Sequence, residues 1–115
     1  MKILLASIAF AAGALAFAPP ANAKTATCRI QSEDGRYNGP CTFTPAGKGS
    51  FSIAAPKGRR MVGETTVISV EMVGGGEAEV RGLTTDGINS RWGTAKRSRT
   101  KRGCWVGSDF SVCAI

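Results

Sequence analysis

The stretch from Ser90 to Cys113 holds the side chains most able to do chemistry. It contains both tryptophans, two of the four cysteines, and a run of cations with no acid between Arg91 and Arg102. Such a run attracts phosphates, anionic glycans and acidic lipid headgroups by screened Coulomb attraction. The sequence therefore predicts an anion-binding site whose residues are Arg91, Lys96, Arg97, Arg99, Lys101 and Arg102.

The same run has a second interpretation, as a solvated loop that binds no ligand. Charge runs usually belong to the solvent-exposed surface of a protein. This one also lacks the interleaved aromatic residues on which nucleic-acid bases stack. The sequence alone leaves both interpretations open.

No catalytic residues are predicted in the chain. General acid–base catalysis uses histidine most often, and the sequence has none. Glu71 and Glu79 could face each other as a pair of carboxylates, but on the solvent side of two strands rather than in a cleft. The sequence Ser98-Arg99-Thr100-Lys101 matches the S-x-x-K pattern of penicillin-recognising enzymes without the companion motifs. We therefore expect a protein that is not an enzyme and that carries no cofactor.

The N-terminal segment has the three parts of a secretory signal peptide. Lys2 supplies a positive start, residues 3–18 are an unbroken apolar run, and Ala21-Asn22-Ala23 is a small-x-small cleavage site. The alternative is an uncleaved anchoring helix, although a membrane span needs about 20 apolar residues. We predict a signal peptide over residues 1–23, a single domain over residues 24–115, and a periplasmic or secreted location.

The first two cysteines flank a predicted hairpin. Export makes disulfides expected, because oxidising compartments preserve them. Cys28 and Cys41 are equidistant from Asp34-Gly35, the favoured dipeptide of a tight turn. That register places them directly opposite each other in a non-hydrogen-bonded pair, where Cα atoms are close enough for a disulfide. It also gives Pro40, which has no N–H, a hydrogen-bonded position, so we expect a bulge or an edge strand there.

The last two cysteines also lie at equal distances in sequence from a predicted turn. Cys104 and Cys113 are equidistant from Ser108-Asp109, so we predict the pairs Cys28–Cys41 and Cys104–Cys113. The alternative use of four cysteines is a structural zinc site, which needs more closely spaced cysteine pairs. No histidine is present to complete a mixed site, and we expect no metal.

Alternating segments separated by turn residues make up the rest of the chain. The clearest runs from Thr65 to Val73, after which glycines 74–76 reverse the chain so that Met72 meets Ala78. The segment from Pro45 to Gly49 is expected to break the second strand. We predict an all-β sandwich or small barrel of about seven or eight short strands, with no helix.

A second strong turn, Asp86-Gly87, precedes the first tryptophan. It is expected to fold Arg81 back against Trp92. Trp92 is expected in the core, beside a disulfide. Trp105 follows Cys104 directly, so its ring should point to the face opposite the disulfide, where it is either buried or exposed for stacking.

Three pieces near the C-terminus resemble a known group of proteins. Arg91-Trp92-Gly93, Cys104-Trp105-Val106-Gly107 and Phe110-Ser111-Val112-Cys113 resemble the C-terminal half of small exported bacterial proteins that carry no assigned function. The resemblance covers the last quarter of the chain. It implies export and a disulfide.

These features predict an exported binding or envelope-associated protein whose basic loop binds an anionic partner, either a glycan, a lipid headgroup or an acidic protein. Without Lys2, 14 Lys and Arg residues against 8 Asp and Glu residues leave a charge of +6. We expect a monomer without a transmembrane segment, and intracellular nucleic acid is not an expected partner. The alternatives are a protein-binding inhibitor or stability module with apolar contacts around Trp105, and a purely structural secreted domain.

Overall fold

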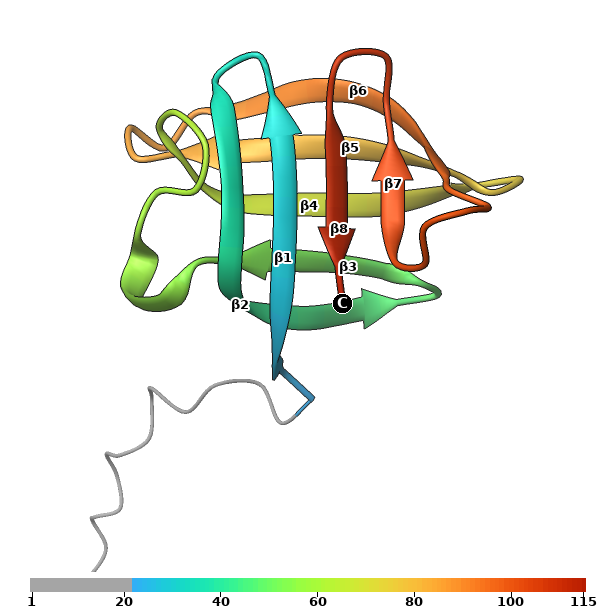
Figure 1. Ribbon diagram of the computed structural model, residues 1–115, viewed down its shortest axis with the longest axis horizontal. Coiled ribbons are helices and arrows are strands. Elements are labelled where there is room, and N and C mark those ends of the chain that lie inside the picture. Colours follow the sequence, from blue (N-terminus) through green and yellow to red (C-terminus); the bar gives the residue numbers. More distant parts are fainter. Residues whose placement is uncertain (1–21) are drawn as a thin grey trace, which may run out of the picture.

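The computed structural model describes residues 22–115, which form a closed barrel of eight antiparallel strands (Figure 1). Each strand pairs with the next along the chain, and β8 pairs with β1 to close the barrel. The strands are β1 (Lys24–Ser32), β2 (Gly35–Gly47), β3 (Ser50–Ala54), β4 (Thr65–Gly74), β5 (Glu77–Thr84), β6 (Asn89–Arg97), β7 (Cys104–Val106) and β8 (Ser111–Ala114). The predicted all-β fold is confirmed, and of the two predicted architectures the chain adopts the barrel.

A short 3-10 turn, η2 (Pro56–Gly58), lies between β3 and β4, and within residues 22–115 no helix is long and apolar enough to cross a membrane. The predicted signal peptide lies outside the described residues, apart from Asn22 and Ala23.

The strands cross in two layers. Figure 1 shows β1, β2, β7 and β8 running across β4, β5 and β6 at a steep angle. β2 belongs to both layers, because its first half pairs with β1 and its second half, from Thr42, pairs also with β3. The layers also meet between β6 and β7, which pair only through Lys96 with Val106 and Arg97 with Trp105. The earlier part of β6 is paired with β5 alone, and turns from other strands pack beside it.

Apolar side chains that alternate along the strands fill the barrel. In β4, Ile68 and Val70 are completely buried, whereas Glu71 is exposed. The same alternation places Ala78 and Val80 of β5 beside them in the core. Because successive side chains of a strand point to opposite faces, the period of two in the sequence specifies which side chains enter the core.

The predicted register of the β4–β5 hairpin is confirmed. Met72 lies opposite Ala78, and Glu71 lies opposite Glu79, with a bulge at Val73 before the glycine turn. The β5–β6 hairpin also forms, but Arg81 lies opposite Arg91 rather than Trp92. The pairing is displaced by one position from the turn onward, where Leu83 lies opposite Asn89. A bulge at Trp92 then restores the predicted register, because one extra residue shifts the pairing back so that Val80 lies opposite Gly93.

The second strand is longer than predicted. The segment from Pro45 to Gly49 does not break it, because β2 continues through Pro45 to Gly47. Pro45 lies opposite Phe51, and a bulge at Ala46 precedes the last pair, Gly47 with Ser50.

Both predicted disulfides are confirmed, but the predicted register of the first hairpin was wrong by two residues. Cys28 lies opposite Gly39 rather than Cys41. The Cys28–Cys41 disulfide is therefore diagonal, with Cα atoms 5.8 Å apart. A shift of two residues keeps every side chain on its own face of the sheet, so the pairing survives although the register does not.

Pro40 explains the observed register. It lies opposite Thr27, whose N–H donates to the carbonyl of Ile115 and whose carbonyl accepts from the N–H of Ile115. The hydrogen-bonding edge of Thr27 therefore faces away from β2, and Thr27 and Pro40 form a non-hydrogen-bonded pair. In this register the missing N–H of Pro40 costs no hydrogen bond, so neither the expected bulge nor an edge strand is needed.

The two disulfides lie on opposite faces of the barrel wall. Cys28 and Cys41 belong to the buried core. Cys104 and Cys113 lie directly opposite each other as predicted, with Cα atoms 4.0 Å apart. Their neighbour Trp105 points into the core, so this disulfide is on the outer face, beside the loop that connects β6 to β7.

Candidate functional site

Five of the six predicted anion-binding residues lie together at one end of the barrel. Lys96 and Arg97 are the last residues of β6, and Arg99, Lys101 and Arg102 follow in the loop to β7. We refer to these five residues as the basic cluster, and to residues 98–103 as the basic loop. All five side chains are exposed.

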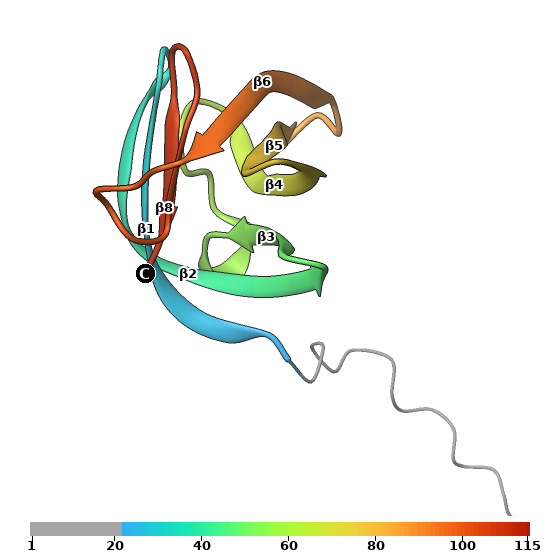
Figure 2. The same cartoon turned by 90° about the vertical axis from the view of Figure 1, so that its right-hand side faces the viewer.

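Two other turns share this end of the barrel. Figure 1 shows the β2–β3 turn, the β4–β5 turn and the basic loop on the right-hand side, and Figure 2 looks onto that side. The N–H of Arg97 donates to the carbonyl of Gly76 in the β4–β5 turn, 3.0 Å away. The β2–β3 turn contributes a further exposed cation, Lys48. Cations from separate parts of the chain thus gather on one end of the molecule.

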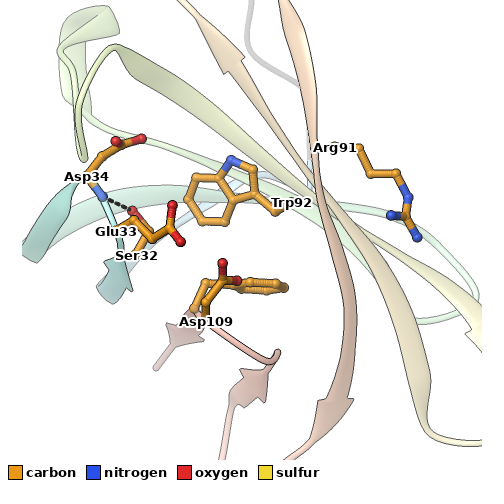
Figure 3. Close-up of a pocket in the computed structure, with 7 residues that line it drawn as sticks. Ser32, Glu33, Asp34, Arg91, Trp92 and Asp109 are labelled. Atoms are coloured by element: carbon orange, nitrogen blue, oxygen red, sulfur yellow. Dashed lines mark hydrogen bonds between the residues drawn. The ribbon is translucent and has the colours of Figure 1, made fainter.

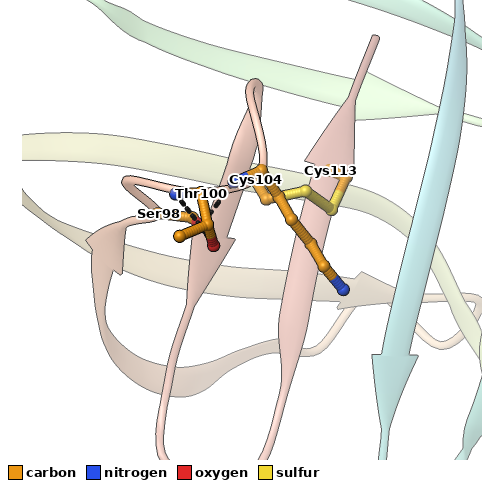
Figure 4. The surroundings of a disulfide bond; sticks show 5 residues. Ser98, Thr100, Cys104 and Cys113 are labelled. Carbon is orange, nitrogen blue, oxygen red and sulfur yellow. Dashed lines mark hydrogen bonds between the residues drawn. A yellow bond between two sulfur atoms is a disulfide. The ribbon is translucent and has the colours of Figure 1, made fainter.

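The basic loop is held by hydrogen bonds of its own (Figure 4). The hydroxyl of Ser98 accepts from the N–H groups of Thr100 and Lys101, at 3.2 and 3.0 Å. The N–H of Ser98 donates to the carbonyl of Cys104, and the N–H of Cys104 donates to the carbonyl of Lys101. Because these bonds close the loop on itself, its three cations project from an ordered backbone.

The outer disulfide and the C-terminal strand hold the far side of the loop. The N–H of Ala114 donates to the carbonyl of Gly103, 3.0 Å away. Cys104, the next residue, is joined to Cys113 of β8 (Figure 4). The loop is therefore attached to β8 by one covalent link and one hydrogen bond within adjacent residues.

Arg97 differs from the rest of the basic cluster, because it stacks on an aromatic ring. Its guanidinium lies over the indole of Trp105, 4.8 Å from the ring centre. Trp105 is 3 % exposed and belongs to the core. Of its two expected roles it has the buried one, so it offers no surface for the apolar contacts that the alternative function places around it.

Arg91, the sixth predicted residue, is separate from the cluster. Six strand positions separate it from Arg97, which corresponds to about 20 Å. Its Nη2 donates to Oε1 of Glu79 at 3.2 Å, and its Nε contacts Oε2 of the same carboxylate. The sequence predicts one site from Arg91 to Arg102, but β6 extends this run along the barrel, and the first cation, Arg91, is paired with Glu79.

The Glu79 carboxylate accordingly serves in an ion pair. It lies opposite Glu71, as predicted, and Arg91 supplies the compensating charge. Among residues 22–115 the ion pairs are Arg91–Glu79 and Arg60–Glu64, and neither includes a member of the basic cluster.

A second group of cations, Lys57, Arg59 and Arg60, lies on the β3–β4 connection at the opposite end of the barrel. Arg60 donates to Glu64 at 2.9 Å, and Glu64 also accepts from the hydroxyl of Thr85 at 2.8 Å. The hydrogen bond from Thr85, followed by the interactions with Arg60, lowers the pKa of Glu64 below its ordinary value. These contacts fasten the connection to the β5–β6 turn, and this group does not join the basic cluster.

Sequence reasoning missed a pocket at Trp92, on the part of β6 that no β7 residue pairs with. Trp92 is partly buried, not fully in the core, and packs edge-on against Phe110 with ring centres 5.6 Å apart. The pocket has a volume of about 160 Å³ and is also lined by the turn residues Glu33, Asp34 and Asp109. No sequence signal links these residues, because two turns, β1–β2 and β7–β8, bring them together beside β6.

Figure 3 shows how the charged side chains are arranged around this pocket. The carboxylates of Glu33 and Asp109 are directed toward the indole of Trp92, whereas that of Asp34 is turned away. Arg91 points away from the indole, in keeping with its ion pair to Glu79. In the described part of the chain, no three His, Cys, Asp or Glu side chains gather closely enough to hold a metal ion.

Comparison with known proteins adds no relative to this description. No family model, no curated protein and no solved structure matches the chain.

Proposed function

We propose that the protein is an exported, non-catalytic binding protein whose basic cluster holds an anionic component of the cell envelope. The observation that carries the proposal is the ordered basic loop, whose cations project from a closed backbone and form no ion pair within residues 22–115. Five like charges close together repel each other, so an external anion is their natural counterpart. Glycans and lipid headgroups with phosphate or carboxylate groups have this chemistry, and an acidic protein is the alternative partner.

The proposed location rests on two features of the chain. The first 23 residues have the composition of a signal peptide, and the four cysteines form two disulfides. Disulfides persist in the periplasm and outside the cell, where thiols are not kept reduced. Both features favour a periplasmic or secreted protein.

The arrangement of the basic cluster favours binding in two ways. The hydrogen bonds of Ser98 and the Cys104–Cys113 disulfide restrict the loop before any partner arrives, which reduces the entropy lost on binding. The indole of Trp105 restricts the Arg97 side chain in the same manner. A freely moving loop of the same composition lacks both advantages.

The absence of histidine in the sequence supports a non-catalytic role. The two carboxylates that could have formed a catalytic pair, Glu71 and Glu79, lie on the outer face of β4 and β5. Glu79 is occupied by Arg91. Such an arrangement favours charge compensation over proton transfer.

Heparin affinity chromatography and anionic vesicles test the proposal for the glycan and lipid forms of the anion. The informative variant replaces the three loop cations by glutamine: Arg99→Gln, Lys101→Gln and Arg102→Gln. Each cation near an anionic surface contributes about 1 kcal/mol, so the three together should lower affinity about a hundredfold at low salt. Arg97 is left intact, because its contact with Trp105 makes it part of the packing.

The matched control removes the same charge elsewhere: Arg36→Gln, Lys57→Gln and Arg59→Gln. These side chains are exposed and lie outside the basic cluster. The control should retain most of the affinity, and binding of the wild type should weaken steeply with ionic strength. If the two triple variants lose affinity equally, or if the wild type binds neither matrix, the solvated-loop interpretation is correct.

A further inference from the structure

The pocket at Trp92 lies beside the β1–β2 and β7–β8 turns, away from the basic cluster, and has a composition of its own. Its apolar surface comes from Trp92 and Phe110, whose rings meet edge-on. The polar lining is Ser32, Glu33, Asp34, Arg91 and Asp109. The carboxylates of Glu33 and Asp109 are directed toward the indole, whereas Arg91 points away from it and is paired with Glu79 (Figure 3). Neither carboxylate takes part in an ion pair within the described residues. An aromatic face beside free carboxylates is complementary to an organic cation.

The size of the pocket limits what it can hold. Its volume of about 160 Å³ is smaller than the roughly 300–1,000 Å³ of sites that enclose a drug-sized ligand. A single long side chain with a guanidinium or ammonium group is a better match. Its apolar stem would contact Phe110, and its charged end would lie over Trp92 between the two carboxylates.

A second recess extends the pocket toward β8. It has a volume of about 350 Å³ and shares Glu33, Asp109 and Phe110 with the first. Its further lining consists of polar groups, among them Gln31, Ser108 and Ser111. These side chains can exchange hydrogen bonds with a peptide backbone. The recess therefore continues the pocket beyond the reach of one side chain, which favours a peptide segment over a free small amine.

From these features we infer that the two recesses form a docking site for a basic peptide segment of a partner protein, with one arginine or lysine side chain in the Trp92 pocket. The cation stacks on the indole of Trp92 and pairs with Glu33 and Asp109. The neighbouring peptide lies across the second recess, between the β1–β2 and β7–β8 turns. The site is distinct from the basic cluster and does not rest on the function proposed for it.

Calorimetric titration with short synthetic peptides tests the inference directly. The probe is acetyl-Gly-Ser-Arg-Ser-Gly-amide, and its control carries citrulline, which keeps the shape of arginine without its charge. The arginine peptide should bind at least about tenfold more tightly than the citrulline peptide. It should also bind about tenfold more tightly than N-acetylarginine amide, which cannot reach the second recess. If the citrulline peptide or N-acetylarginine amide binds as tightly as the arginine peptide, the inference is overturned.

Variants of the protein locate the binding. Glu33→Gln with Asp109→Asn should weaken the arginine peptide at least about tenfold, because it removes both carboxylates that face the indole. The matched control, Glu71→Gln with Asp86→Asn, makes the same change of charge at residues that do not line the pocket. Equal losses of affinity in the two variants would mean that peptide binding depends only on the net charge of the protein. Should the double variant not fold, the single variants Glu33→Gln and Asp109→Asn provide the same comparison with Glu71→Gln.

Discussion

Gly103 occupies the most restricted position of the basic loop. Its φ is +79°, and a Cβ atom added to it would lie 2.5 Å from the carbonyl oxygen of Ala114. That oxygen is backbone, and the adjacent Ala114 N–H already bonds to Gly103, so neither group can move aside easily. Glycine is therefore required where the loop passes close to β8.

Replacing Gly103 by alanine should cost at least about 2 kcal/mol of unfolding free energy, because backbone strain and a clash add. Gly76→Ala is the matched control, since its φ is +76° and nothing lies within 4 Å of the added Cβ. It should lose only the strain, about 1 kcal/mol. Urea unfolding of both variants measures the difference, and equal losses would show that the contact with Ala114 is not restrictive.

At the level of strands and loops, the two disulfides connect different parts of the barrel. Cys28–Cys41 is buried inside the barrel and ties the first hairpin diagonally. Cys104–Cys113 is also buried, but it lies on the outer face of the barrel wall, apart from the main core cluster, and attaches the basic loop to β8. Both should stabilise the fold by about 3 kcal/mol on the chain-entropy estimate, but only the second also restricts the basic loop.

Removing each disulfide separately should therefore have different effects on binding. The variant Cys104→Ala with Cys113→Ala should lower heparin affinity severalfold, because the loop loses an anchor and must be ordered on binding. The variant Cys28→Ala with Cys41→Ala should lower thermal stability at least as much, since it also leaves a cavity in the core, yet keep its heparin affinity. Heparin elution at a temperature where circular dichroism shows both variants folded provides the test. Equal losses of affinity would contradict a special role for the outer disulfide.

In the whole molecule, the two candidate binding surfaces lie on different parts of the barrel and carry charges of opposite sign. The basic cluster lies where β6 ends, and the carboxylates around Trp92 lie at the β1–β2 and β7–β8 turns. Trp92 and Arg97 are five positions apart on β6, about 16 Å. The barrel is therefore long enough to separate two binding surfaces of opposite sign, and a net positive charge conceals that separation.

The two surfaces should act independently. We expect the triple glutamine variant of the basic loop to bind the arginine peptide within about twofold of wild type, because distant sites add without coupling. Conversely, the Glu33→Gln, Asp109→Asn variant and its charge-matched control, Glu71→Gln, Asp86→Asn, should elute from heparin at the same salt concentration. Combining both sets of changes in one chain and repeating the two measurements reveals any coupling. A coupling above about 0.5 kcal/mol would show that the barrel transmits one binding event to the other.

Local patterns in the sequence determined much of this fold. The alternation around Ile68 and Val70, with the glycines that follow, specifies the register of β4 and β5, because a hairpin and its buried face constrain the same pairing. The positions of Cys104 and Cys113 about Ser108-Asp109 specify the last hairpin for the same reason. The first hairpin shows the limit of this method. The favoured turn at Asp34-Gly35 predicted one register, and the missing N–H of Pro40 favoured another.

Only the tertiary structure decided how the cations and tryptophans are divided. Arg91 and Arg97 are close in sequence, but an extended strand separates them, and Glu79 on the neighbouring strand neutralises the first. Trp92 was expected in the core, yet it lies at the corner where β6 leaves β7, whereas Trp105 fills the interior. The pocket around Trp92 depends on the β1–β2 and β7–β8 turns meeting beside β6. Contacts between distant segments have no local pattern, because the closure of the barrel alone brings them together.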